Sequence, residues 1–277
     1  MSSLNAALRP AFDLLLAPFA GLPPLVPIAI AALLVAVAML LVFKRTSDQA
    51  RLAAVKRQIT AGIFEIRLFN DDLVAIMHAQ RDILRHNLTY LRLTLVPTLW
   101  ILLPLALVIA QLQFHYGYQG LRPGQQTLLR VDLVPGAVPA GQRPQVKLAV
   151  PAGLSADSDA VWIPSLSQLA WRLNALKDGD YAVAVTLDGA APIEKTVRVT
   201  PLAVRLSPDR LDSGFVSQML YPAEAPVPAA GPVRAIRVTY PDREVSVLGF
   251  GLNWMIPFFA LSLGFAFALK GFFKVTI

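Results

Sequence analysis

The sequence predicts an α-helical membrane protein that carries an all-β domain outside the membrane. The chain has 277 residues, of which 55% are hydrophobic and 16% charged, whereas globular chains average about 25% charged residues. Its apolar excess lies in three blocks without an ionisable side chain, residues 25–43, 93–113 and 247–269. Each block is close to the roughly 20 residues that cross a bilayer as a helix. Residues 114–246 have an ordinary composition and contain short β-rich runs, so we expect a β-sandwich between the second and third transmembrane helices.

The N-terminal 24 residues predict a short helix that lies on the membrane surface. Prolines 23, 24 and 27 separate this segment from the first transmembrane helix, residues 25–43. Lys44 and Arg45 follow the apolar run instead of preceding it, which is not the order of a signal peptide. We therefore expect an uncleaved anchor.

The distribution of charge predicts the orientation of the chain. Residues 44–92 hold nine basic and five acidic side chains, whereas residues 114–246 hold thirteen and twelve. Short cytoplasmic loops collect Lys and Arg. We expect residues 44–92 and the tail, residues 270–277, in the cytoplasm and the N-terminus outside, in a bacterial cytoplasmic (inner) membrane.

The cytoplasmic segment, residues 44–92, predicts a coiled-coil hairpin of two amphipathic helices. A turn and helix-start signal at residues 70–72 separates the two helices. One apolar stripe is expected on each helix; the stripes are Leu52, Val55, Ile59, Ile63 and Ile66, and Leu73, Ile76, Met77, Leu84, Leu88 and Leu91.

Two interpretations of this hairpin remain open. The stripes can pack against each other in water, or the hairpin can lie against the membrane surface and guide apolar segments. In the second case basic side chains hold it near anionic headgroups, at about 1 kcal/mol each; these are Lys44, Arg45, Lys56, Arg57, Arg81 and Arg85.

The second and third transmembrane helices carry the candidates for a polar groove. No turn signal separates the hairpin from the second transmembrane helix, residues 93–113, in which Pro97 and Pro104 predict kinks. Asn253 lies in the third, residues 247–269, where a polar side chain needs a partner or water. The candidate groove or client-contacting residues are Arg92, Asn253, Pro97, Pro104, Trp100 and Met77.

The extracytoplasmic region, residues 114–246, predicts an immunoglobulin-like β-sandwich without a disulfide, because the chain has no cysteine. Tyr181 follows a turn at residues 177–180 and resembles a tyrosine corner, with Trp171 on a preceding strand. The expected strands are residues 126–133, 145–150, 169–173, 181–187, 195–200 and 233–240.

No motif for catalysis is present in the sequence. Without cysteine and with three histidines, thiolate chemistry is excluded and a metal site is not expected. We see no Ser/His/Asp order, phosphate-binding glycine loop or nucleic-acid-binding signature. We expect a protein that is not an enzyme and has no cofactor, metal ion or nucleic-acid partner.

The order of one inward transmembrane helix, a basic cytoplasmic hairpin, a return helix and a third helix ending inside resembles the YidC/Oxa/Get-type membrane insertase superfamily. It is most similar to the short EMC-subunit and archaeal YidC-like branch, over residues 25–113 and 247–277. A weak likeness around Arg85–Pro97 (RHNLTYLRLTLVP) adds to this order. The resemblance implies a cytoplasm-facing hydrophilic groove that accepts client segments, with Arg92, Lys44 or Arg45 as its basic residue.

Two functions remain open. The first is an insertase-like protein or membrane chaperone that assists insertion or assembly of client membrane proteins. The alternative is a non-catalytic structural or assembly subunit whose β-sandwich binds an extracytoplasmic protein partner. The lipid bilayer is a partner in both.

Overall fold

The computed structural model describes residues 2–69, 71–139 and 142–275. The chain divides into two compact units. Unit 1 contains Met1–Pro27 and Leu107–Trp254, and unit 2 contains Ile28–Ala106 and Met255–Ile277.

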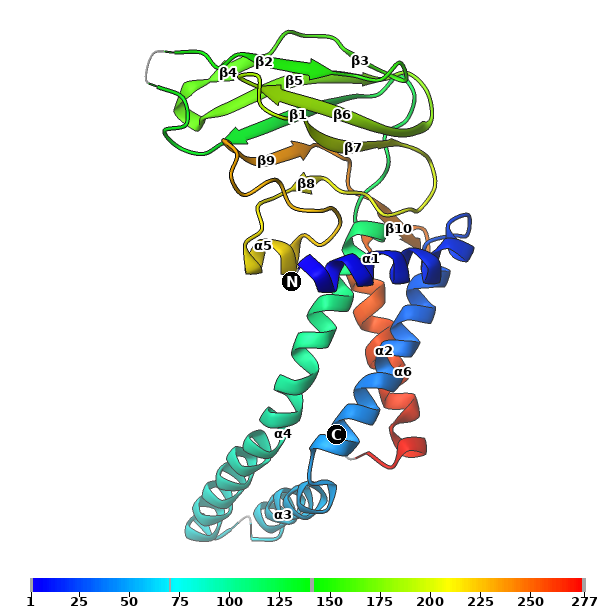
Figure 1. Ribbon diagram of the computed structural model, residues 1–277. Helices are drawn as coiled ribbons and strands as arrows, with labels where there is room; N and C mark the ends of the chain where they lie inside the picture. The colour runs from blue at the N-terminus through cyan, green and yellow to red at the C-terminus, as the bar shows by residue number, and fades with distance from the viewer. Residues whose placement is uncertain (1, 70, 140–141, 276–277) are drawn as a thin grey trace. The chain divides into compact units, whose positions relative to one another are not determined.

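Unit 1 is built around antiparallel β-sheets (Figure 1). One sheet has the strand order β3-β5-β1-β9-β8, with β4 also paired to β5, and another has the order β2-β6-β7. The strands are β1 (Gln126–Leu133), β2 (Val146–Ala149), β3 (Leu154–Ala156), β4 (Val161–Ile163), β5 (Gln168–Ala175), β6 (Gly179–Leu187), β7 (Ile193–Val199), β8 (Asp209–Arg210) and β9 (Val233–Val238).

The two sheets share one hydrophobic core, as the strand pattern predicts. Alternate residues of the long strands are buried, such as Leu129 on β1, Leu169 on β5, Val183 on β6 and Val197 on β7, all 0% exposed. Successive side chains of a strand point to opposite faces, so one face of each sheet supplies this core. The predicted strand positions are confirmed to within a few residues.

The turn before β6 has the hydrogen bond of a tyrosine corner. The hydroxyl of Tyr181 donates to the backbone carbonyl of Lys177 at 2.8 Å. Trp171, on β5, is buried in the same core. The bond ties the start of β6 to the turn that precedes it.

Helices complete unit 1. They are α1 (Ser2–Leu16), the short 3₁₀ helices η1 (Ala17–Phe19) and η2 (Pro164–Leu166), and α5 (Phe215–Leu220). The last turns of α4 (Leu73–Tyr116) also belong to this unit. The expected N-terminal helix is confirmed as a helix.

Unit 2 is helical. It contains α2 (Leu25–Thr46) from Ile28 onward, α3 (Gln49–Leu68), most of α4, and α6 (Met255–Phe273). The helices α2, α4 and α6 are long and apolar enough to cross a membrane. The carboxylate of Asp72 accepts the backbone amides of Val74 and Ala75 at the start of α4, so the predicted helix-start signal is confirmed there; Asn70 lies outside the described residues.

The start of the third expected transmembrane helix was predicted wrongly. Residues 247–253 are not helical but belong to a hairpin of β10 (Glu244–Val247) and β11 (Phe250–Asn253). Leu248 and Gly249 form its two-residue turn with φ angles of 51° and 88°, and such left-handed pairs match the twist of a hairpin. Hydropathy alone does not distinguish this apolar hairpin from a helix.

The end of the same helix also differs from the prediction. The helix α6 extends to Phe273, so Lys270 is in its last turn and not in a tail. Of the expected cytoplasmic tail, residues 276–277 lie outside the described residues.

Candidate functional site

The helix α4 has two apolar faces, and one of them packs within unit 2. Its buried or half-buried residues alternate at spacings of three and four, which is a coiled-coil pattern; they are Ile76, Ala79, Ile83, His86, Tyr90, Leu93 and Pro97. A Cβ atom added to Gly62 of α3 would lie 2.7 Å from Cγ1 of Ile83. The helices α3 and α4, which occupy the two expected helical stretches, therefore approach closely at Gly62.

The residues that pack in this hairpin are only partly those predicted. On α3, Leu52 and Val55 are buried, but Gly62 takes the place expected for Ile63, which is 48% exposed. On α4, of the six predicted residues only Ile76 is in the packed face. The small residues Gly62 and Ala79 let the helices approach, and a search for large apolar side chains overlooks them.

The other apolar face of α4 is exposed along its length. We call this face the α4 track, and its residues are Met77, Leu84, Leu88, Leu91, Leu95, Leu99 and Leu102. Each is between 56% and 63% exposed. The spacings of seven, four, three, four, four and three keep them on one side of a helix.

The α4 track joins two regions of different predicted surroundings. Its first four residues are in the part of α4 expected in the cytoplasm, and the last three are in the expected transmembrane part. At about 1.5 Å per residue, the track is about 38 Å long. One continuous helix thus carries the same apolar face through both regions.

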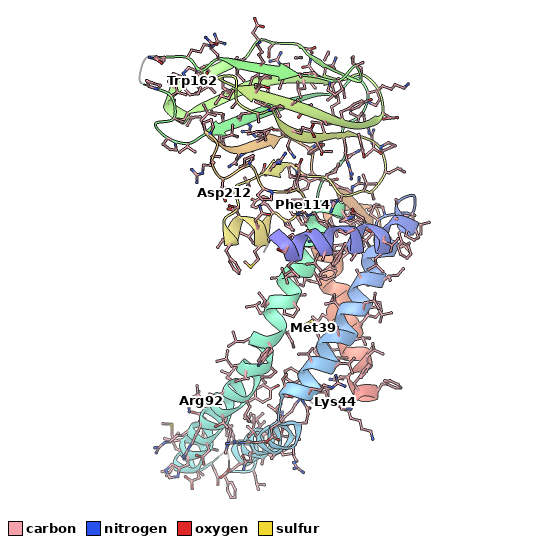
Figure 2. All side chains as sticks on the ribbon, viewed as in Figure 1. Met39, Lys44, Arg92, Phe114, Trp162 and Asp212 are labelled. Carbon is pink, nitrogen blue, oxygen red and sulfur yellow. The ribbon has the colours of Figure 1, made fainter. Side chains whose placement is uncertain are left out.

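Three arginines line one edge of the α4 track. Arg81, Arg85 and Arg92 are exposed and spaced by four and seven residues, so they form one row on the helix. Figure 2 labels Arg92 on α4 and Lys44 near the end of α2. The predicted basic residues Arg81 and Arg85 therefore accompany the candidate groove residues Met77 and Arg92.

The other predicted basic residues are on α2 and α3. Lys44 and Arg45 are in the last turn of α2. Lys56 and Arg57 border a shallow, open hollow on α3 with Ala53, Thr60 and Phe64. Phe64 is 62% exposed, so α3 also presents an apolar side chain beside basic groups.

The remaining predicted groove residues do not join the α4 track. Pro97 is buried in the packed face, and Trp100 is 66% exposed on another side of the helix. Pro104 is exposed, and α4 continues through both prolines. Asn253 ends β11 in unit 1, opposite Glu244. The placement of Asn253 in a transmembrane helix was wrong, because the helix begins after it.

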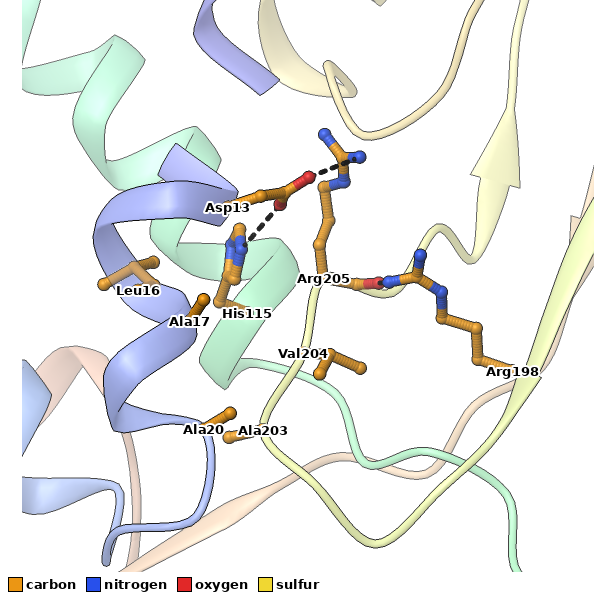
Figure 3. Close-up of a pocket in the computed structure, with 9 residues that line it drawn as sticks. All are labelled: Asp13, Leu16, Ala17, Ala20, His115, Arg198, Ala203, Val204 and Arg205. Atoms are coloured by element: carbon orange, nitrogen blue, oxygen red, sulfur yellow. Dashed lines mark hydrogen bonds and ion pairs between the residues drawn. The ribbon is translucent and has the colours of Figure 1, made fainter. Parts of the chain in front are cut away.

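The structure also shows a polar cluster in unit 1 that sequence reasoning missed (Figure 3). His115, on the last turn of α4, lies with its Nε2 atom 3.2 Å from a carboxylate oxygen of Asp13 on α1. The other Asp13 oxygen is 2.8 Å from Arg205. The Nδ1 atom of His115 is 3.0 Å from the carbonyl oxygen of Gln111. These contacts connect α1, the end of α4 and the segment after β7, which are far apart in sequence.

The charges of this cluster compensate one another. Partial burial by itself raises the pKa of the Asp13 carboxyl, but the hydrogen bond with His115 and the charge of Arg205 hold that pKa below its usual value. Arg198, which also lines the pocket in Figure 3, forms an ion pair with Asp180 at 3.3 Å. The arrangement therefore fits a structural connection better than a free ionic site.

A second missed cluster lies inside unit 1. The ammonium group of Lys195 on β7 is 0% exposed and donates to the carbonyl oxygen of Ser207 at 2.5 Å and to the carboxylate of Glu224. Glu224 also accepts from the Ser207 hydroxyl at 2.8 Å and from the Thr196 amide at 3.1 Å. Burial by itself raises the pKa of Glu224, but the charge of Lys195 and these hydrogen bonds outweigh burial and hold that pKa below its usual value.

This Lys195 cluster is closed to substrates, because its ammonium group has no accessible surface. A buried charge that is paired and hydrogen-bonded stabilises one conformation of the chain. Among the described residues, no group of three or more His, Cys, Asp or Glu side chains could hold a metal ion.

Comparisons with known proteins give no further guide to the site. No protein-family model matches the chain, and no curated protein or solved structure matches it.

Proposed function

We propose that the protein is an insertase-like protein or membrane chaperone that assists the insertion or assembly of membrane proteins. The observation that carries this proposal is the α4 track. It is the function that the resemblance to the YidC/Oxa/Get-type superfamily implies. In this proposal the chain lies in a bacterial cytoplasmic membrane, with its N-terminus outside and the hairpin and C-terminus in the cytoplasm.

The hairpin part of the α4 track supplies a receiving surface. Exposed apolar area costs about 25 cal/mol per Å² in water relative to burial, and exposed apolar stripes mark binding sites. Met77, Leu84, Leu88 and Leu91 expose such a stripe. An apolar segment of a client protein that packs on this stripe removes apolar area from water, which lowers the free energy.

The transmembrane part of the same face gives the client a route into lipid. Leu95, Leu99 and Leu102 continue the stripe, so a client segment keeps apolar contact as it moves from the hairpin toward hydrocarbon. Arg92 lies beside the change from one part to the other. Its guanidinium draws water and headgroups toward the track, which lowers the cost of moving polar residues of the client.

Site-specific photocrosslinking tests this proposal in the full chain. A crosslinker at Leu88 or Leu99 is expected to capture newly made membrane proteins. The matched controls are Asp82 and Trp100, which are exposed on other sides of the same two parts of α4. Equal capture at the control positions contradicts a specific track.

Reconstitution measures the activity directly. Liposomes that contain the full chain are expected to insert a newly synthesised membrane protein better than empty liposomes, and Leu84→Ser/Leu88→Ser is expected to lose the gain. A Leu166→Ser variant on η2 is the control. The alternative is an assembly subunit whose immunoglobulin-like sandwich binds an extracytoplasmic partner. It is favoured if the double variant retains insertion, or if crosslinks form only at a label on Val161 of the sandwich.

A further inference from the structure

The helix α1 has the reverse of the polarity expected for a helix on a domain that faces water. Its polar residues Asn5, Arg9 and Asp13 recur every four residues and face the interior of unit 1, where Asn5 is 0% exposed. Leu14 and Leu15 face outward and are 79% and 55% exposed, whereas Leu16 is buried. In water this arrangement would be inverted.

The inward polar row has definite partners. The amide nitrogen of Asn5 donates to the backbone carbonyl of Gln218 on α5 at 2.5 Å. Asp13 contacts His115 and Arg205. These bonds determine which side of α1 faces out, so the exposed leucines are a consequence of the fold of unit 1.

The adjacent helix α5 exposes apolar side chains in the same way. Phe215, Val216 and Leu220 are 64%, 60% and 51% exposed, whereas Gln218 is buried. Figure 1 shows α1 and α5 next to each other in unit 1, and the bond between Asn5 and Gln218 joins them. We call the outward residues Leu14, Leu15, Phe215, Val216 and Leu220 the α1–α5 platform.

The segments next to the platform indicate that lipid is what covers it. From η1 the chain reaches α2, a candidate transmembrane helix, within six residues. Asp13 contacts His115, one residue before α4 ends, so α1 lies at the level where that candidate transmembrane helix ends. The hairpin that leads directly into α6 exposes Leu248 and Phe250 in the same way, at 95% and 71%.

We infer that the α1–α5 platform is embedded in the outer surface of the bilayer and holds the β-sandwich on the lipid. Helices α1 and α5 contain two charged residues, Arg9 and Asp13, and both are half-buried on the inward side. The attachment is therefore apolar and does not depend on anionic lipid. It goes beyond the proposed function, since it assigns the sandwich a fixed position on the membrane whichever client the α4 track binds.

Spin labels test this inference on the full chain in lipid nanodiscs. The chain contains no cysteine, so Leu14→Cys and Val216→Cys each introduce one labelling site. The control is Leu166→Cys on η2, which is 64% exposed. Labels at residues 14 and 216 are expected to collide several-fold more with oxygen than with a water-soluble nickel complex, and the label at 166 is expected to show the opposite ratio.

Two outcomes overturn the inference. If the labels at residues 14 and 216 collide with the nickel complex as often as the label at residue 166 does, the platform lies in water. Labels shielded from both oxygen and nickel would indicate that a second copy or another protein covers it. The ratios are also expected to be equal in phosphatidylcholine with and without phosphatidylglycerol; burial that appears only with the anionic lipid contradicts an apolar attachment.

Discussion

The β-sandwich of unit 1 and the helices of unit 2 use apolar side chains in opposite ways. In the sandwich, leucines and valines such as Leu129 and Val197 are 0% exposed. On α4, leucines such as Leu84 and Leu102 are 63% and 58% exposed. A domain in water is stabilised by burying apolar area, whereas apolar area that faces hydrocarbon has no such drive to be buried. The difference fits the presence of three helices in this chain that are long and apolar enough to cross a membrane.

The largest expected effect is in the sandwich, where the ion pair of Lys195 and Glu224 is buried. Glu224→Gln is expected to reduce the stability of the sandwich by about 3 to 5 kcal/mol, because removing one partner leaves a buried, uncompensated charge. Amide hydrogen exchange of β7 in the full chain in nanodiscs measures this loss. Lys195→Met/Glu224→Gln is expected to recover part of it, and an unchanged exchange rate in Glu224→Gln contradicts the role of the pair.

The same substitution is expected to have unequal effects in the two regions. Leu169→Ala on β5 creates a cavity in the sandwich core and should cost about 2 to 5 kcal/mol. Leu102→Ala on the α4 track is expected to cost less than about 0.5 kcal/mol, because the side chain is exposed. Hydrogen exchange of β5 and of α4 in the same nanodiscs compares the two. Similar losses of stability at Leu169 and Leu102 would contradict the expected difference between the sandwich core and the α4 track.

A smaller effect is expected at the tyrosine corner. Tyr181→Phe removes the hydrogen bond to the carbonyl of Lys177 and is expected to cost about 0.5 to 1 kcal/mol. Hydrogen exchange of β6 measures it. Lys177→Ala is the matched control, since the acceptor is a backbone atom that this variant keeps. Equal loss in both variants would mean that the bond is not the cause.

Much of the architecture could be predicted from the pattern of residues. Alternation placed β1 at Gln126–Leu133 with the observed bounds, and the absence of a turn signal between Asp72 and Val96 predicted one helix across that range. Both signals are local, because they depend on which side of a strand or helix each residue faces. The start of α6 was missed, since the apolar hairpin at residues 247–253 has the same hydropathy as a helix.

The candidate site was predictable only in part. The stripe on α4 was recognised, and two interpretations of it were left open: packing against α3 or lying against the membrane surface. Gly62 and Ala79 make the interface between α3 and α4 instead, and the leucines remain on the α4 track. Sequence periodicity finds apolar faces, but it does not say which of two faces meets a partner.

The sequence by itself determined that the chain contains three apolar helices, with one β-domain between the second and the third. Length, hydropathy and strand alternation are properties of neighbouring residues, so they can be read without the fold. Only the tertiary structure decided which apolar faces are covered. It turned the polar row of α1 inward through Asp13, His115 and Arg205, and it buried Lys195 beside Glu224. The partners in these contacts are separated by 29 to 192 residues in the sequence. Such contacts form only when distant segments fold together, and here they determine which apolar surfaces remain exposed.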